Sequence, residues 1–217
     1  MKTYLSRAAC AVYTVLVLSM ICLTAAGAPA AGQGNVIEQS CGQENTGGKR
    51  VLIAYDGKHG STQIVAGWIA QTLCDCGFQV DTGRARYISD LSGYDAVVAG
   101  SPIYFAKFLP GTSMFLKKHE QELAAMPVAF FILSTLVDEQ TGLVKEETKA
   151  FFVDKELARV PSIAPVGDIG MFGGEFTFSE LYPVEVLSMN LSNYKDGDYL
   201  NAGVVAQWAE NLCGLFK

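Results

Sequence analysis

Short, largely apolar runs alternate with amphipathic segments along most of the chain. Five such runs occupy residues 51–55, 78–82, 94–100, 127–133 and 163–172. The first of them, VLIAY, is uninterrupted, which is typical of a strand buried on both faces of a sheet. The pattern therefore predicts five strands.

The segments between these runs have the spacing of helices. We expect helices over residues 62–76, 111–125, 146–159 and 202–216. In the first of these, Gly77 follows the last apolar position, which is a common way for a helix to end. Strands that alternate with helices pair in parallel through right-handed crossovers. We therefore predict an α/β fold, a doubly wound five-stranded parallel sheet with helices on both faces, in one domain over residues 49–217.

The amino-terminal segment follows a different pattern. Lys2 and Arg7 precede an uncharged stretch over residues 8–31, and small residues close it. This layout predicts a secretory signal peptide over residues 1–31, with cleavage near Ala30. An uncleaved membrane anchor is the alternative, although the small residues after Leu23 favour cleavage. Residues 32–48 are predicted to be a flexible tether. The chain is thus expected to be exported to a periplasmic or extracellular site, or anchored in a membrane by this segment alone.

Composition and charge exclude several classes of protein to which the chain could otherwise belong. The chain has 217 residues, of which 50% are apolar and 18% charged, so collagen-like, coiled-coil and disordered proteins are excluded. Its formal net charge is −6. Removal of the two cations of the leader leaves 14 Lys and Arg against 22 Asp and Glu, a charge of −8. This balance argues against a nucleic-acid partner.

A loop rich in small and polar residues follows the first strand. In a doubly wound sheet, ligands bind beyond the carboxyl ends of the strands, where the next helix presents its free N–H groups. Glycines allow the backbone to curl around an anion, and hydroxyl groups add hydrogen-bond donors. We therefore predict a phosphate-binding loop, although a tight turn with a helix cap remains the alternative. Its residues are Gly57, Lys58, His59, Gly60, Ser61 and Thr62.

Two further loops are predicted at the same edge of the sheet. The loop after the third strand contains aromatic side chains that would suit a flat ligand, unless they pack on neighbouring helices. The loop after the fourth strand adds small hydroxyl groups. A phosphate loop beside an aromatic loop indicates a mononucleotide with an aromatic head. The candidate residues are Ser101, Pro102, Ile103, Tyr104, Phe105, Ser134, Thr135 and Leu136.

Several of these segments resemble the flavodoxin superfamily. Residues 55–62 and 94–123 carry most of the similarity, and the motifs at residues 170–174, 197–199 and 208–209 add to it. The similar branch is that of flavodoxin-domain proteins related to menaquinone-dependent protoporphyrinogen oxidase. The resemblance covers the chain from about residue 49 to its end. It implies that residues 57–62 hold the phosphate of FMN and that residues 101–105 and 134–136 flank the isoalloxazine ring.

Two positions depart from the family pattern. Family members commonly have Ser or Thr where Gly57 stands, so one hydroxyl donor is missing. Asp56 would repel a phosphate if its side chain turned into the loop. Lys58 and His59 either compensate by their charge or face solvent.

Four cysteines remain after the leader, namely Cys41, Cys74, Cys76 and Cys213. The predicted fold gathers them at the pole opposite the phosphate loop, away from any flavin. An even number of cysteines in an exported chain favours structural disulfides over a reactive dithiol. Cys74 and Cys76 point about 200° apart on a helix, so they should have different partners. We expect the pairs Cys76–Cys213 and Cys41–Cys74. No metal site is expected.

These features together predict an exported FMN-binding redox protein. It would transfer electrons between a donor and a quinone or protein partner, either as a carrier or as a quinone-linked enzyme. A porphyrinogen is disfavoured as substrate because haem synthesis is intracellular. Residues 172–193 are rich in aromatic side chains, among them Phe172, and are expected to wall a substrate site. The alternative is a binding module that retains the fold without the flavin, as Asp56 and Gly57 would favour.

Overall fold

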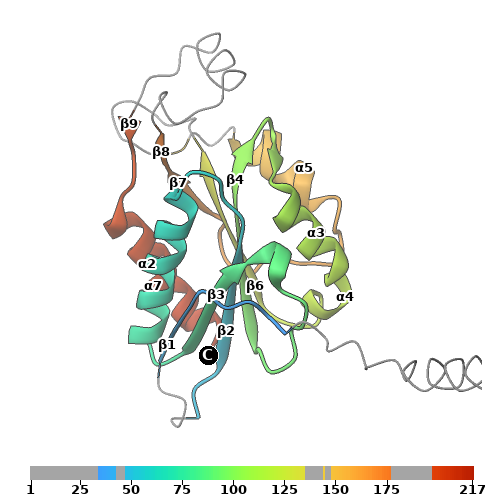
Figure 1. The fold of residues 1–217 in the computed structure, drawn as a ribbon, viewed down its shortest axis with the longest axis vertical. Helices are drawn as coiled ribbons and strands as arrows, with labels where there is room; N and C mark the ends of the chain where they lie inside the picture. Colours follow the sequence, from blue (N-terminus) through green and yellow to red (C-terminus); the bar gives the residue numbers. More distant parts are fainter. Residues whose placement is uncertain (1–33, 43–46, 135–143, 145–147, 177–196) are drawn as a thin grey trace, which may run out of the picture. The chain divides into compact units, whose positions relative to one another are not determined.

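Five parallel strands form the centre of the structure, which is a computed structural model. It describes residues 34–42, 47–134, 144, 148–176 and 197–217. The parallel strands stand in the order β3-β2-β4-β6-β7 (Figure 1). Their bounds are β2 (Arg50–Tyr55), β3 (Gln79–Arg84), β4 (Ala96–Tyr104), β6 (Val128–Ser134) and β7 (Gly170–Gly173). The predicted five-stranded parallel sheet is confirmed.

The strand that comes first in this parallel series, β2, lies in the interior of the sheet between β3 and β4. From β2 the chain winds first toward one edge and then, from β4 onward, toward the other. Such a reversal leaves a crevice at the carboxyl ends of the two central strands, where doubly wound proteins bind ligands. The loops after β2 and β4 therefore define the candidate site.

Helices cover both faces of the sheet, as predicted (Figure 1). The helix α2 (Ser61–Asp75) and the helix α7 (Ala202–Leu215) pack on one face. The other face carries α3 (Pro110–Lys118), α4 (Glu120–Leu123), the π-helix η2 (Lys149–Val153) and α5 (Asp154–Leu157). Alternate residues of β2 point to opposite faces, so each of the two apolar cores receives part of the strand.

Several boundaries differ from the predicted ones. The strand β4 continues to Tyr104, and it forms a hairpin with β5 (Lys107–Phe108). The last parallel strand is shorter than residues 163–172, because Pro165 makes only an isolated bridge and Gly167 has a φ of 67°. The predicted helix over 111–125 is divided into α3 and α4 at His119. These differences arise from local breaks that the apolar spacing does not reveal.

Part of the segment predicted to be a tether is a strand. Residues Gln39–Cys41 form β1, which pairs with β3 in the antiparallel direction. The prediction of a tether without regular structure was thus wrong for these residues. These residues form a strand because β3 would otherwise have one row of unpaired backbone N–H and C=O groups at the edge of the sheet. The polar sequence of β1 suits an edge strand, since little of it needs to be buried.

Both predicted disulfides are present. Cys41 is bonded to Cys74 with a Cα–Cα distance of 6.1 Å, and Cys76 is bonded to Cys213 at 6.2 Å. The first bond fastens the edge strand β1 to α2, and the second fastens α2 to α7. Both bonds involve the carboxyl-terminal end of α2, while its amino-terminal end lies beside the candidate site.

Removal of each disulfide should destabilise the protein by an amount that depends on the loop it closes. The Cys41–Cys74 bond closes a loop of 33 residues and the Cys76–Cys213 bond one of 137. A longer closed loop restricts the unfolded chain more, so we expect losses of about 3–5 kcal/mol, larger for the second bond. Chemical denaturation of the double Cys→Ser variants measures both values. A larger loss for the shorter loop would contradict this explanation.

Asp81 should make stability depend on pH. Its carboxylate accepts hydrogen bonds from Ser40 (2.6 Å), Tyr94 (2.8 Å) and Arg50 (2.9 Å). Partial burial opposes ionisation, but these hydrogen bonds outweigh it and lower the pKa of Asp81. A group whose pKa is lower in the folded state stabilises the protein above its unfolded pKa and loses that effect as the pH falls.

We therefore expect Asp81→Asn to lower the free energy of unfolding by about 1–2 kcal/mol at pH 7. The difference from the parent protein should shrink on acidification toward pH 3. Urea denaturation of both proteins across this range measures it. A difference that stays constant with pH would show that the ionised carboxylate is not responsible.

Candidate functional site

The loop between β2 and α2 has the backbone expected of an anion-binding loop. Gly60 has a φ of 93°, a left-handed conformation that glycine adopts without strain, and it turns the chain into α2. The first turn of α2 contains no acidic side chain. The N–H groups at the start of a helix have no partner within the helix, and they carry a partial positive charge. This end of α2 therefore favours an anion.

The hydroxyl group of Ser61 is bonded to another part of the chain. It donates to the carbonyl oxygen of Glu175 (2.9 Å) and accepts from the Glu175 amide (3.2 Å). Glu175 begins the short strand β8 (Glu175–Phe176), which pairs with β9 (Gly197–Asp198). Ser61 thus fastens β8 over the start of α2, while Thr62 is buried beside it.

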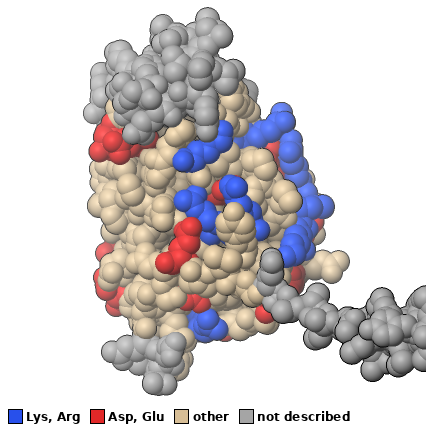
Figure 2. Space-filling view, viewed as in Figure 1, with Lys and Arg blue, Asp and Glu red and all other residues tan. Residues whose placement is uncertain are grey.

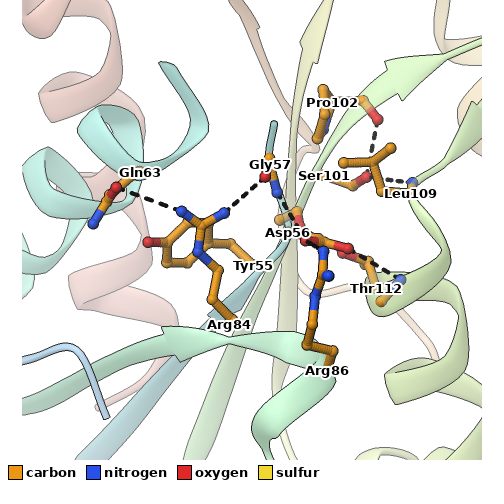
Figure 3. A network of polar contacts seen from close by, with 12 residues as sticks. Tyr55, Asp56, Gly57, Gln63, Arg84, Arg86, Ser101, Pro102, Leu109 and Thr112 are labelled. Atoms are coloured by element: carbon orange, nitrogen blue, oxygen red, sulfur yellow. Dashed lines mark hydrogen bonds and ion pairs between the residues drawn. The ribbon is translucent and has the colours of Figure 1, made fainter. Parts of the chain in front are cut away.

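The side chain of Asp56 is bonded to the start of α3 and to the first residue of the β2–α2 loop. This side chain is fully buried, and one oxygen accepts from the Gly111 amide (3.1 Å) at the start of α3. The other oxygen accepts from the Gly57 amide (3.0 Å) and pairs with the guanidinium of Arg86 (Figure 3). The hydrogen bond to Asp56 and the charge of that carboxylate raise the pKa of Arg86. The expected repulsion of a phosphate by an inward Asp56 does not apply in this geometry.

Two arginines that the sequence analysis did not select border the loop. Arg86 lies in the short helix η1 (Ala85–Tyr87), directly after β3. Arg84 ends β3, and its Nη1 donates to the carbonyl oxygen of Gly57 (2.8 Å; Figure 3). The sequence offered one usable signal, since β3 neighbours β2 and its carboxyl end must reach the same edge of the sheet. Two basic residues at that end were candidates on this ground.

The loop after β4 divides into a buried part and an exposed part. Ser101 has only 1% of its surface exposed. Its hydroxyl donates to the Pro102 carbonyl (2.9 Å) and accepts from the Leu109 amide (2.9 Å). The side chain of Ser101 thus shapes the loop, and its hydroxyl has two partners in the protein. Pro102 and Ile103 are partly exposed.

Tyr104 and Phe105 lie at the outer end of this loop. Phe105 and Ala106 form the two-residue turn of the β4–β5 hairpin, with φ values of 47° and 60°. Two left-handed residues in succession make a type I′ turn, which costs energy without glycine. The ring of Phe105 packs edge-on against Tyr104 (4.8 Å between centroids) and is 59% exposed. Burial of this ring on a neighbouring helix, the alternative considered above, does not occur.

The two loops contact each other through Lys58. Its Nζ lies 3.7 Å from the centroid of the Tyr104 ring, which is a cation–π contact. Lys58 and His59 are exposed residues of the β2–α2 loop, and Lys58 lies on the side of the aromatic hairpin. Figure 2 shows Lys and Arg side chains near the middle of the face drawn there and along its α3 side.

Not every predicted residue is described. Ser134 is buried at the end of β6, next in the sheet to β4. Thr135 and Leu136 lie outside the described residues, as does most of the segment 172–193. Phe172 itself is buried against Phe131 and Trp208, so it belongs to the core and not to a substrate wall.

The described residues also bear on metal sites and on membrane spans. No group of three or more His, Cys, Asp or Glu side chains in the described ranges is arranged to hold a metal ion. None of the helices described has the length and apolar character that a membrane span requires.

Comparison with known proteins identifies the family. The model of the flavodoxin domain matches residues 52–199, which is more than half of the chain. The chain belongs to the flavodoxin-domain family. A solved oxidoreductase from Corynebacterium diphtheriae shares this fold with a TM-score of 0.50, at 14% identity over 78% of this chain and 97% of that one. Flavodoxin 2 from Bacillus cereus is similar at 18% identity, with a TM-score of 0.49 over 77% and 97% of the two chains.

A curated relative carries a more specific description. The flavodoxin-domain chain is 31% identical over 112 residues to the protoporphyrinogen IX dehydrogenase [quinone] of Escherichia coli strain K12. The match covers 49% of this chain and 62% of the relative. It thus confirms the resemblance to this branch, over about half of the chain.

Arg86 and Asp56 should be coupled energetically. Arg86→Gln leaves the buried carboxylate of Asp56 without its counter-charge, so we expect a loss of about 1–3 kcal/mol in the free energy of unfolding. The double variant Arg86→Gln with Asp56→Asn should lose less than the sum of the single losses, by about 1 kcal/mol or more. Denaturant unfolding of the three variants measures this coupling. Additive losses would show that the pair does not interact.

A glycine in the turn at the tip of the aromatic hairpin should relieve the backbone strain there. Ala106→Gly removes the cost of a left-handed alanine, so we expect a gain of about 1 kcal/mol in stability. Ala124→Gly is the matched control, since Ala124 is exposed and has a φ of −67°. The control should lose about 0.5–1 kcal/mol. Equal losses in both variants would contradict the assigned turn geometry.

Proposed function

We propose that this protein binds FMN and transfers electrons between a donor and a quinone or a protein partner. The observation that carries the proposal is the contact between Lys58 and Tyr104. It joins an anion-binding helix start to an exposed aromatic hairpin at one edge of a flavodoxin-type sheet. A ligand with a phosphate at one end and a flat ring at the other matches both parts.

The residues of the loop fit a phosphate group. Gly60 turns the chain so that the start of α2 lies at the carboxyl edge of the sheet, and Thr62 lies in its first turn. The carboxylate of Asp56 is occupied by Arg86 and by backbone amides. Arg84 and Arg86 lie beside the loop, where each is paired with a carboxylate, Glu38 and Asp56 respectively. These features support binding of a dianionic phosphate.

The hairpin supports binding of the flavin ring. Phe105 and Tyr104 present aromatic surface at the mouth of the site, and stacking on such surface stabilises a flat ligand. When bound, FMN supplies the one- and two-electron chemistry, and the side chains set its orientation and solvent access. Ser134, Thr135 and Leu136 are also proposed to flank the ring. No side-chain acid or base is needed for this role.

A quinone is the proposed small-molecule partner. The relative from Escherichia coli is described as a quinone-linked dehydrogenase, and this chain matches a little under two thirds of that protein's length. Whether the flavin oxidises a small substrate or only relays electrons distinguishes an enzyme from a carrier within the same proposal.

We further propose that the protein works in an oxidising compartment outside the cytoplasm. Two disulfides join β1, α2 and α7. Structural disulfides persist where thiols are not kept reduced. The leader predicted over residues 1–31 would direct such export.

The second candidate function is a flavin-free binding module. Gly57 lacks the hydroxyl group common at this position, and the hydroxyl of Ser61 is engaged by Glu175. These two observations reduce the number of side-chain donors available to a phosphate. In this case the fold and its charged face would serve a protein partner.

Titration of the purified, disulfide-bonded protein with FMN tests the two functions. We expect quenching of flavin fluorescence at a 1:1 ratio, and weaker binding of riboflavin, which lacks the phosphate. Phe105→Ala should weaken both flavins roughly 2- to 10-fold, the equivalent of about 0.5–1.5 kcal/mol of stacking. Met114→Ala, which removes an exposed side chain of α3, is the control and should have no effect. Absence of quenching at saturating FMN would leave the binding module as the function.

Given FMN binding, turnover separates the enzyme from the carrier. The flavin-loaded protein is mixed with a chemical reductant of flavins and a soluble quinone, and quinone reduction is followed by absorbance. Faster reduction than with free FMN supports a quinone-linked reaction. Reduction no faster than with free FMN would favour a protein acceptor.

A further inference from the structure

An amino-terminal segment follows the edge of the sheet toward the anion-binding loop. Residues 36–41, here called the strap, include β1 and the residues just before it. Their backbone is bonded along β3 and η1: the Glu38 amide donates to Thr82 (2.8 Å), and the Val36 amide donates to Tyr87 (3.3 Å). The strap thus runs antiparallel to β3, toward the carboxyl edge of the parallel sheet as one reads from Cys41 back to Val36.

The strap is fastened covalently at one end. Cys41 forms the disulfide with Cys74, near the carboxyl-terminal end of α2. The opposite end of α2 begins at Ser61, in the loop proposed to hold the phosphate. The disulfide therefore fixes the position of the strap relative to the helix that carries this loop.

Glu38 connects the strap to the strands beneath it. One carboxylate oxygen accepts a hydrogen bond from Nε of Arg84 (3.1 Å). The other accepts from the phenolic hydroxyl of Tyr55, whose ring is buried at the end of β2. Both oxygens of Glu38 are thus used, one toward β3 and one toward β2.

Arg84 extends this connection to the loop itself. Its Nη1 donates to the carbonyl oxygen of Gly57 (2.8 Å), and its Nη2 contacts Oε1 of Gln63 at 3.5 Å (Figure 3). Gly57 precedes the bend of the loop, and Gln63 lies in the first turn of α2. The guanidinium also lies over the Tyr55 ring, 4.9 Å from its centroid. One side chain therefore contacts the loop on both sides of its bend.

We propose that Glu38 and Arg84 are positioning residues for the phosphate of the flavin, and that the Cys41–Cys74 disulfide holds Glu38 in place. The inference rests on the proposed function, since it concerns the same site. A loop with two glycines, Gly57 and Gly60, loses much conformational entropy when it closes around an anion. Fixing its carbonyl oxygen at Gly57 before binding reduces that cost and so increases affinity.

Positioning of the loop by Arg84 and direct binding of the phosphate by Arg84 predict opposite changes in FMN affinity when Glu38 is replaced. If Arg84 positions the loop, Glu38→Gln loosens Arg84 and weakens FMN binding. If Arg84 itself binds the phosphate, loss of the Glu38 charge frees its guanidinium and strengthens FMN binding. The direction of the change in affinity thus decides between the two roles.

The test compares FMN with riboflavin in matched variants. Glu38→Gln, and separately Cys41→Ser with Cys74→Ser, should raise the dissociation constant of FMN roughly 5- to 10-fold and leave that of riboflavin unchanged. A general loss of structure would weaken both flavins alike. Cys76→Ser with Cys213→Ser is the control, because it removes the other disulfide of α2 without touching the strap. This control should keep the parental ratio of the two constants.

A third variant perturbs the strap without changing a cysteine or a charge. A Cβ at Gly83 would lie 2.6 Å from the carbonyl oxygen of Val36, so Gly83→Ala displaces the strap from β3. It should raise the FMN constant selectively, as the other strap variants do. Unchanged or tighter FMN binding in the strap variants would overturn the inference while leaving the proposed function intact.

A measurement without flavin separates failure of the inference from failure of the proposed function. Hydrogen exchange of the amides at residues 57–62 should be faster in the strap variants than in the parent and in the control. If the parent protein binds no FMN, the proposed function fails, and the assignment of Glu38 and Arg84 to phosphate affinity fails with it. Faster exchange would then show only that the strap orders the loop.

Discussion

The geometry of the site depends on the hydrogen bonds and the ion pair of one buried carboxylate, that of Asp56. This carboxylate lies at the end of the central strand β2 and accepts hydrogen bonds from the amides of Gly57 and Gly111. Its ionic partner, Arg86, comes from the segment after β3. Three connections of the chain therefore meet at one side chain. A buried charge is costly unless all of its oxygens are paired, so this arrangement constrains the three segments together.

The remaining polar contacts of the site extend from this centre. Ser101 and Thr112 bond the backbone around the start of α3, and Ser61 bonds β8 to the start of α2. Hydroxyl groups that a sequence suggests as ligand donors are thus used to shape the loops. The helix start at Gly60 and the exposed ring of Phe105 are the parts proposed to meet a ligand. Binding of a phosphate would then depend mostly on backbone groups, which agrees with the glycines in the loop.

The two ends of α2 serve different purposes. At one end, two disulfides join the helix to β1 and to α7. At the other, the helix start and the loop before it remain free of covalent constraint. The strap links these ends, because it leaves the disulfide at Cys41 and reaches Arg84 through Glu38. In the proposed role, the end of the strap that the disulfide fixes restrains the β2–α2 loop through the contacts of Glu38 with Arg84 and of Arg84 with Gly57.

The sequence by itself predicted the five parallel strands, the order of strands and helices, and the gathering of the four cysteines at one pole. A strand or helix that buries one face has apolar residues at regular intervals. This periodic pattern is visible in the sequence without knowledge of the tertiary structure. The topology then placed Cys41, Cys74, Cys76 and Cys213 at one pole and the loops after β2 and β4 at the other. The apolar pattern did not predict the edge strand β1, because a strand that buries few side chains has no such pattern.

Only the tertiary structure decided which polar side chains face a ligand and which bond to the protein. The direction of Asp56, the internal use of Ser61 and Ser101, and the approach of Arg84 to Gly57 each depend on a segment distant in the chain. A polar side chain takes its partner from whatever the fold brings within hydrogen-bond distance, and that choice leaves no periodic trace. The sequence therefore predicted a candidate site at the carboxyl edge of the sheet, and the structure determined how the charges around it are arranged.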